Sequence, residues 1–293
     1  MFIKKLIVKV VIPVSFLIVA VVGLAYIMTE STRTKRVEIN VQEINVDMGA
    51  AALARGEDVY LTRGCADCHD LDAGGKTFIN EPPIGHYAGT NLTTGSGGVA
   101  TKYKTAKDWN QAIRYGLDPS GRPLMFMPSH EFHPLSVKDT AALIAYLMSR
   151  PAVNRTNPAS MPGPMARVLY LFGQFPMLFP YQHVDATQAQ AEDVPMAATV
   201  EYGQYLATGC VGCHGQNYTG GRIPGVPPDW PPAADITSKG VMGQYGLADF
   251  KLLMRTGKTF SGKTVDPKYM PWTGMSRLKD VEIEALFNFL RSR

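Results

Sequence analysis

The stretch TGCVGCHGQ, residues 208–216, places two cysteines two residues apart and a histidine directly after the second. The stretch RGCADCHDL, residues 63–71, repeats this arrangement. The chain has four cysteines in 293 residues, so every cysteine belongs to one of the two C-x-x-C-H motifs. The duplication predicts two copies of one unit, each organised around its motif. The six motif residues are Cys65, Cys68, His69, Cys210, Cys213 and His214.

Similarity between the two halves extends beyond the motifs. A shift of 145 residues aligns Tyr60 with Tyr205, and a shift of 143 aligns the Met-Pro dipeptide at Met127 with that at Met270. The shifts differ by only a few residues, as insertions in loops would produce. The expected segments are two domains, 48–151 and 198–293, and an interdomain linker, 152–197.

Both copies predict helices at matching places, so we expect a mostly α-helical fold. Apolar residues of the last helix recur at i, i+1, i+4 and i+5 in the first copy and at i, i+3, i+4 and i+7 in the second, as on the buried face of an amphipathic helix. No stretch alternates apolar and polar residues convincingly at the period of a β-strand. The expected helices are 50–62, 105–115 and 137–149 in the first copy, and 199–208, 247–255 and 279–292 in the second.

The N-terminus predicts a membrane anchor. Residues 10–28 carry no charge in 19 positions, and with the residues just before them they are long enough for one spanning helix, which needs about 20 residues. A secretory signal peptide is the alternative, but its apolar region is shorter, roughly 7–15 residues. We expect 1–36 to be an anchor with its flanks, contacting the lipid bilayer through 6–28. The rest of the chain is nearly neutral despite the net charge of +4, which gives no reason to expect a nucleic-acid partner.

The C-x-x-C-H motif is an attachment sequence for c-type haem. Its spacing on one helical turn brings both sulfurs to the vinyl-bearing edge of the porphyrin and directs the histidine to the iron. A zinc half-site and a redox disulfide also use C-x-x-C. Zinc needs further paired ligands in the same copy, and a thioredoxin-like disulfide needs a βαβ context; the sequence offers neither. We therefore expect two covalently bound c-type haems, with His69 and His214 as iron ligands.

Methionine is the expected ligand on the opposite face of each iron. Methionine or histidine usually occupies that position. Of 14 methionines, only Met127 and Met270 coincide under the shift of 143, and each precedes a proline, which holds the preceding residue extended. A histidine in place of Met127 would give a bis-histidine haem. The alternative ligands are Met125, Met275, His130 and His133.

The expected linker is not uniform. Its first part is rich in proline and glycine, as linkers are. The stretch 166–181, ARVLYLFGQFPMLFPY, is more apolar than a solvated linker should be, yet too short and broken to span a membrane. Two interpretations stay open: packing across the domain interface, or contact with the membrane surface or an integral partner.

Together these features resemble the class I c-type cytochromes, in a membrane-anchored form with two haems. Each copy also has an Asn-Leu-Thr or Asp-Ile-Thr element, at 91–93 and 235–237. The chain is similar as well to the haem subunits of periplasmic dehydrogenases, which usually carry three such domains. The resemblance implies a helical fold and one haem per domain. It also implies that a proline carbonyl holds each iron-ligating histidine, with Pro83, Pro227 and Pro228 as candidates.

Two six-coordinate irons would leave no coordination position for a substrate, so we expect outer-sphere electron transfer and no catalytic residue. The expected location is the bacterial cytoplasmic membrane, crossed once, with the haem domains in the periplasm, where c-type haem is attached. A membrane respiratory complex or periplasmic dehydrogenase would be the donor, and an oxidase, reductase or soluble cytochrome the acceptor, with the chain a carrier or a subunit of a complex. The alternative is a dihaem enzyme of the cytochrome c peroxidase or thiosulfate dehydrogenase type.

Overall fold

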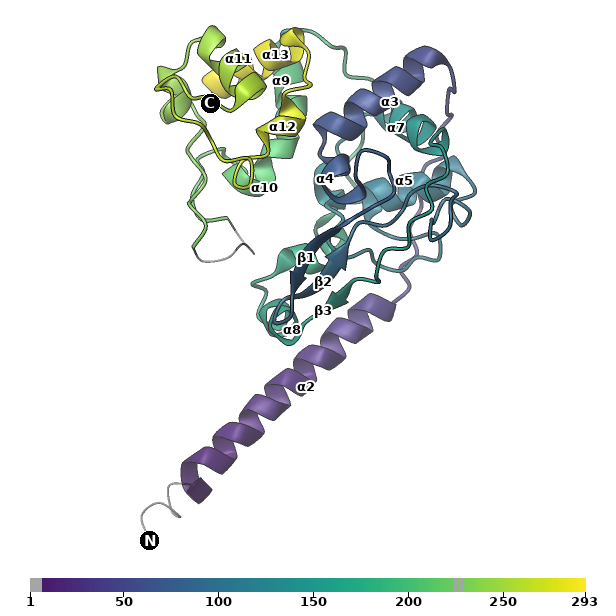
Figure 1. The fold of residues 1–293 in the computed structure, drawn as a ribbon, viewed down its shortest axis with the longest axis vertical. Helices are drawn as coiled ribbons and strands as arrows, with labels where there is room; N and C mark the ends of the chain where they lie inside the picture. The colour runs from purple at the N-terminus through teal and green to yellow at the C-terminus, as the bar shows by residue number, and fades with distance from the viewer. Residues whose placement is uncertain (1–6, 224–225, 227–228) are drawn as a thin grey trace.

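The structure is a computed structural model that describes residues 7–223, 226 and 229–293. A long N-terminal helix leads into a body made of two helical domains (Figure 1). This N-terminal helix consists of η1 (Ile7–Val11) and α2 (Ile12–Thr34). The first domain contains α3 (Ala50–Thr62), α4 (Cys65–His69), α5 (Ala106–Tyr115), α6 (Ser129–Phe132) and α7 (Val137–Met148). The second contains α9 (Val200–Ala207), η4 (Thr208–Cys210), α10 (Val211–His214), η5 (Val241–Gln244), α11 (Leu247–Thr256), α12 (Trp272–Met275) and α13 (Asp280–Arg291).

The mostly α-helical class is confirmed, and local signals explain where the helices begin and end. Helix α5 starts with a capping box between Thr105 and Asp108 and ends at Gly116, whose φ of 65° is left-handed. Helix α11 follows the same plan, because the Asp249 carboxylate accepts from the backbone at its start and Gly257 ends it with a φ of 70°. The six predicted helices are all present, with ends shifted by at most one residue.

The first and last helices of each domain cross at a glycine. In the first domain α3 packs on α7, and a Cβ on Gly56 would overlap the carbonyl oxygen of Ala142. In the second domain α9 packs on α13, where a Cβ on Gly203 would overlap the carbonyl oxygen of Ala285. Both crossings need a residue without a side chain, so the two domains share the contact that brings their terminal helices together.

Tyr60 and Tyr205, which the sequence aligns, have different roles in the structure. The crossing glycines are 147 residues apart, whereas the C-x-x-C-H motifs are 145 apart. Two residues correspond to about 200° around an α-helix. The ring of Tyr60 therefore packs within its own domain, 5.3 Å from that of Tyr146, while the Tyr205 hydroxyl donates to Asp139 of the other domain at 2.7 Å.

A small antiparallel sheet was not predicted. Strand β1 (Thr77–Glu81) pairs with β2 (Gly85–Ala88), which pairs with β3 (Met161–Pro162). His86 lies opposite Asn80 on one side and Met161 on the other. The sequence does not mark these strands, because each is only two to five residues long and the third comes from a distant part of the chain.

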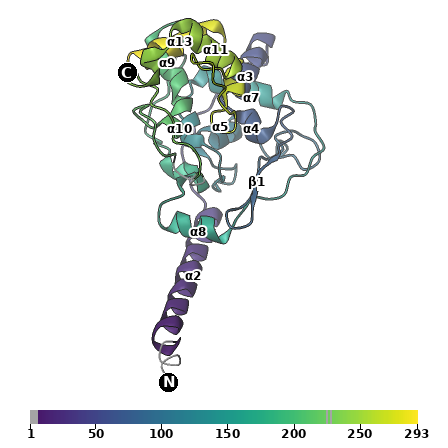
Figure 2. The ribbon, with the colours of Figure 1, turned by 60° about the vertical axis from the view of Figure 1, so that its left-hand side comes forward.

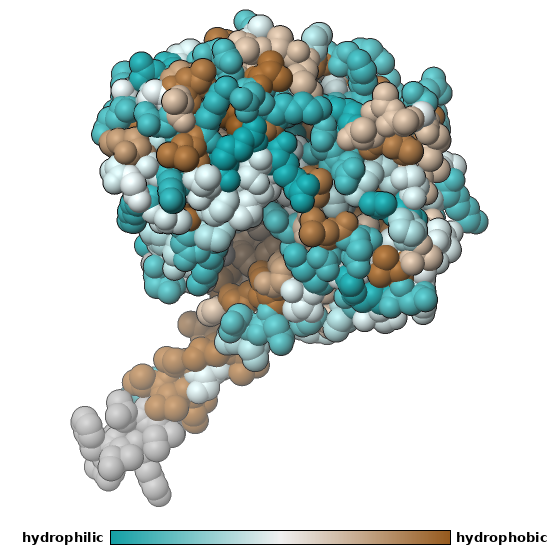
Figure 3. Space-filling model, turned by 45° about the horizontal axis from the view of Figure 1, so that its top comes forward, coloured by the Kyte–Doolittle hydropathy of each residue, from teal (hydrophilic) through white to brown (hydrophobic). Residues whose placement is uncertain are grey.

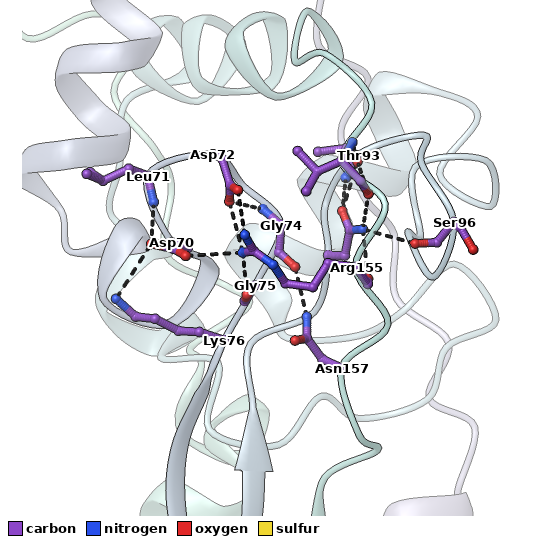
Figure 4. Close-up of polar contacts among 12 residues, drawn as sticks. Asp70, Leu71, Asp72, Gly74, Gly75, Lys76, Thr93, Ser96, Arg155 and Asn157 are labelled. Carbon is purple, nitrogen blue, oxygen red and sulfur yellow. Dashed lines mark hydrogen bonds and ion pairs between the residues drawn. The ribbon is translucent and has the colours of Figure 1, made fainter.

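The first part of the segment expected as a linker, 152–197, lies along the first domain. The Arg155 guanidinium is paired with Asp72 at 2.7 Å and with Asp70 at 3.1 Å (Figure 4). The buried Asn91 side chain donates to the backbone carbonyls of Val153 and Arg155. Asn157 donates to the carbonyl of Gly74 at 2.8 Å. This part of the segment is thus held to the first domain on both sides of Arg155.

The apolar stretch 166–181 also packs on the first domain, and on the N-terminal helix. Helix α8 (Pro164–Leu171) lies against α2 where α2 meets the body (Figures 1 and 2). Beyond it, Phe175 and Phe179 form a buried cluster with Tyr87 of β2. The interpretation that this stretch fills the interface between the two domains was therefore wrong.

The helical stretch Lys9–Thr34, which contains α2, is long and apolar enough to cross a membrane. A signal sequence near the N-terminus meets the same criteria. Only 6% of its most apolar part is buried, and in Figure 3 its apolar surface extends up to the body.

Candidate functional site

The first C-x-x-C-H motif forms a single helical turn, α4. Gly64 enters the turn in the left-handed conformation, with a φ of 75°, and so separates it from α3. Cys65 and Cys68 are half-buried on this turn, and His69 is its last residue. The chain therefore presents two thiols and one imidazole from one compact element.

His69 is oriented by a backbone carbonyl. Its Nδ1 lies 2.8 Å from the carbonyl oxygen of Thr90. Because a carbonyl only accepts, Nδ1 carries the proton and the lone pair of Nε2 is left free to bind a metal. Pro83 was a candidate for this role, and that candidate was wrong, because the Pro83 carbonyl accepts from the backbone N–H of Met165 at 2.8 Å.

The second motif repeats this arrangement on η4 and α10. His214 Nδ1 lies 2.8 Å from the carbonyl oxygen of Ala234, so its Nε2 is free as well. The candidates Pro227 and Pro228 lie outside the described residues, and a carbonyl that does not belong to proline takes the role. Burial lowers the pKa of both His69 and His214, which keeps the imidazoles neutral, as metal ligands must be.

The two Met-Pro dipeptides adopt the same turn. Pro128 has φ −77° and ψ 56°, and Pro271 has φ −77° and ψ 57°. In each case the N–H after the proline donates to the methionine carbonyl at 2.7 Å, which closes an inverse γ-turn. Met127 and Met270 are both half-buried against the main core and each precedes a short helix. Their backbone environments therefore match.

Of the alternative ligands, Met275 packs against the same main core as Met270, and the others have different surroundings. Met125 packs in the separate cluster around Tyr87. His133 is buried with both ring nitrogens engaged, one 3.3 Å from the Arg114 carbonyl and the other 2.8 Å from the Gln190 amide. Met275 lies within α12, and His130 is next to His183, with ring centres 6.2 Å apart.

The donor set fits haem c better than zinc or a redox disulfide. Burial raises the pKa of Cys65 to about 12 and those of Cys68 and Cys210 to about 11, so these thiols are protonated and unsuited to thiolate chemistry. All four cysteines are free of disulfides. Within 7–223, 226 and 229–293, no three His, Cys, Asp or Glu side chains gather as a metal site. Each motif pairs two thiols with one free imidazole nitrogen.

Arg63 joins the two motifs across the domain interface. Its Nη1 donates to the Leu206 carbonyl at 3.0 Å and to Thr208 Oγ1 at 3.2 Å, and its guanidinium lies 4.9 Å from the centre of the Tyr205 ring. Arg63 precedes Cys65 by two residues, and Thr208 precedes Cys210 by two residues. The two C-x-x-C-H turns, 65–69 and 210–214, are called the attachment turns below. They are close neighbours, connected through the hydrogen-bonded side chain of Arg63.

Glu131 is a residue that sequence reasoning missed. It lies on α6, four residues after Met127, yet its carboxylate is so close to the second motif that a Cβ on Gly212 would overlap it. Its side chain is 19% exposed, and burial raises its pKa to about 7. Nothing local marks this residue, because only the docking of the domains brings it to Gly212.

A second polar group at the interface centres on Arg55. Its guanidinium pairs with Asp139 at 2.8 Å and with Glu282 of the second domain at 3.3 Å. Tyr202 donates to Glu282 at 2.8 Å, and Tyr205 donates to Asp139 at 2.7 Å. Both carboxylates are buried, so the network holds the domains in one relative orientation.

The chain is similar in sequence to known proteins. A similar protein is a subunit of nicotinate dehydrogenase from Pseudomonas putida, which is 29% identical over 174 residues. That alignment covers 56% of this chain but only 14% of the relative, so the chain spans a small part of that protein's length. The model of the family "Cytochrome c" matches residues 53–151 and 200–293. These residues contain both attachment turns and together make up more than half of the chain. The chain therefore belongs to the cytochrome c family, whose domains bind haem c covalently.

Proposed function

We propose that this chain relays electrons by outer-sphere transfer through two haems c, one in each domain, at the periplasmic face of the bacterial cytoplasmic membrane. Haem c, when bound, supplies a one-electron centre. The chain supplies the attachment, the iron ligands and a fixed spacing between the two sites. Attachment is assigned to Cys65, Cys68, Cys210 and Cys213, and iron ligation to His69, Met127, His214 and Met270.

The ligand assignment is supported by the equivalence of the two halves. Both imidazoles donate Nδ1–H to a carbonyl, which fixes the ring orientation and leaves Nε2 for the iron. Both methionines precede a proline in the same inverse γ-turn. A peroxidase or thiosulfate dehydrogenase would need one iron with an open or labile position. The likeness of the two Met-Pro turns favours a carrier over either enzyme.

The observation that carries the relay is the contact through Arg63. Electron transfer between two centres slows steeply as their separation grows, so a relay needs the centres close together and held there. Arg63 links the residues just before the two attachment turns, and Arg55 fixes the domains through buried carboxylates. The relay therefore does not depend on a chance encounter between mobile domains.

A retained membrane anchor is supported by contacts at the C-terminal end of α2. Glu30 pairs with Arg167 at 2.8 Å, and Thr32 lies 3.1 Å from the Tyr170 hydroxyl. Removal of α2 as a signal peptide would leave the buried Arg167 without its carboxylate. An anchor would also keep the domains beside membrane partners and raise their effective concentration there.

Similarity to part of a dehydrogenase supports a place in an oxidoreductase complex. We assign a periplasmic dehydrogenase module as the electron donor. A membrane oxidase, a reductase or a soluble cytochrome would accept the electrons. In this arrangement the chain makes no bond to substrate and acts as the electron-transfer subunit.

Flash reduction of the full-length holoprotein in detergent tests the relay. One equivalent of electrons per two haems is injected by a photoreductant, and equilibration is followed in the haem absorption bands. We expect a phase whose rate is independent of protein concentration and slower in Arg63→Met. Arg122→Met, an exposed arginine of the first domain outside the interface, is the matched control. A rate that rises in proportion to protein concentration would show transfer between molecules and contradict the proposal.

A further inference from the structure

A pocket lies where α2 meets α8. It has a volume of about 260 Å³ and is lined mainly by apolar atoms. Val22 and Tyr26 of α2 form one wall and Pro162 and Pro164 another, and among the described residues Arg167 alone adds a charge to the lining. In Figure 3 the apolar surface of α2 continues up to this junction with the body.

Arg167 has an unused hydrogen-bond donor. Its side chain is only 8% exposed. Nη2 pairs with Glu30 at 2.8 Å, Nε donates to the Pro162 carbonyl at 3.1 Å, and the guanidinium carbon lies 4.5 Å from the centre of the Tyr26 ring. Nη1 is buried and has no hydrogen-bond partner in the part of the chain that the structure describes. A buried charged donor without an acceptor is costly, so a ligand with an acceptor oxygen is favoured at this point.

The charge around the pocket favours an anion. Glu30 is shared between Arg167 and Arg33, whose guanidinium lies 2.6 Å away. One carboxylate between two guanidinium groups leaves a net positive charge beside the pocket. A phosphate oxygen accepts hydrogen bonds from guanidinium with good geometry and brings the balancing charge.

The apolar walls indicate where this phosphate would come from. Val22 and Tyr26 belong to the helix assigned to the membrane, and tyrosines are enriched at the membrane–water boundary. We propose that the pocket binds the phosphodiester of an anionic membrane phospholipid, with Arg167 Nη1 donating to a phosphate oxygen and an acyl chain lying along Val22 and Tyr26. This inference rests on the membrane location proposed above.

Native mass spectrometry of the full-length holoprotein, released from detergent with added dioleoyl phosphatidylglycerol, tests the site. We expect one lipid per chain in the unmodified protein. Arg167→Gln removes the donor, and Val22→Trp fills the pocket but leaves the Arg167–Glu30 pair; each should weaken binding about tenfold or more. Lys35→Gln is the matched control, because it removes an exposed cation near the same end of α2 and should bind as the unmodified protein does. Equal lipid binding in all four proteins would overturn the inference.

Two further experiments distinguish the possible reasons for an absence of lipid binding. Inorganic phosphate should not displace the lipid, since it cannot use the apolar walls; displacement would identify a free-phosphate site and overturn the lipid assignment. Carbonate extraction of membranes tests the anchor alone. Protein that stays in the membrane fraction but retains no lipid would contradict this inference and leave the anchor standing. Release of the unmodified protein by carbonate would contradict the anchor and this inference together.

Discussion

At the scale of single residues, the chemistry depends on a few side chains whose neighbours set their state. Among the proposed iron ligands, a carbonyl holds Nδ1 of His69 and of His214, and a turn at the following proline holds the backbone of Met127 and of Met270. Glu131 is different: it is an acid whose burial makes it titrate near neutral pH beside the second motif.

The methionine assignment predicts matched changes in the two domains. Met127→Ala and Met270→Ala should each remove half of the near-infrared sulfur-to-iron band of the oxidised protein and open one haem to carbon monoxide. A methionine ligand raises the potential, so the altered haem should also become easier to oxidise.

Met125→Ala and Met275→Ala are the controls for this experiment. Both remove a half-buried methionine close in sequence to the assigned ligand, and both should keep the whole near-infrared band. Loss of the band in either control, with retention in Met127→Ala or Met270→Ala, would move the assignment to the neighbouring methionine.

Glu131 predicts a pH dependence of the second haem. Its pKa is raised to about 7, so the carboxyl is neutral at pH 5 and negative at pH 8. A negative charge favours the oxidised iron, so the midpoint potential should fall as the pH rises through about 7. Roughly 40 mV is expected, the equivalent of about 1 kcal/mol of charge interaction. Redox titration of Glu131→Gln should show no such step, and exposed Glu201→Gln should retain it.

At the scale of elements, each domain is held together by the crossing of its first and last helices. Gly56 and Gly203 allow these crossings because backbone lies where a side chain would be. The short helical turns α4 and α10 have no core of their own, so their positions depend on the helices that precede them.

Gly56→Ala and Gly203→Ala should each destabilise the protein by roughly 2–4 kcal/mol, because the added methyl meets a carbonyl oxygen that cannot move without the whole helix. Denaturant unfolding of the holoprotein followed by circular dichroism measures the loss. Gly209→Ala is the control, since the nearest atom to its Cβ would be 3.9 Å away, and it should unfold at nearly the same denaturant concentration. Equal midpoints for all three variants would contradict the crossing argument.

At the scale of the whole molecule, the two domains are joined by polar residues buried between them. Burial raises the pKa of Asp139, but hydrogen bonds and charge from Arg55 outweigh it and leave the pKa below its ordinary value. Stability from this carboxylate is therefore present above the ordinary pKa of aspartate, about 4, and is lost as the pH falls through the lower folded value.

Arg55→Met should leave Asp139 and Glu282 buried without their cation and cost about 3 kcal/mol. We expect one cooperative unfolding transition in the unmodified protein and two separate transitions in the variant, as measured by calorimetry at pH 7. Lys138→Ala removes an exposed pair with Asp193 and should leave the single transition unchanged. A single transition at the original temperature in Arg55→Met would show that other contacts couple the domains.

The sequence by itself determined the two attachment turns, the helices and the duplication. These depend on short-range features: the covalent spacing of C-x-x-C-H, apolar periodicity, and helix caps such as Thr105 and Gly116. Local signals of this kind act over a few residues, so they can be recognised without knowing what the chain packs against.

Only the tertiary structure decided which carbonyls hold His69 and His214. It also decided that the segment 152–197 packs on the first domain and α2, and that Arg63 connects the two motifs. Each of these depends on contacts between residues far apart in the chain. Many carbonyls and cations have the same local propensity, so the choice among them is made by packing. Tyr205 shows the reason: a two-residue difference in helix phase turns an aligned tyrosine from its own core toward the other domain.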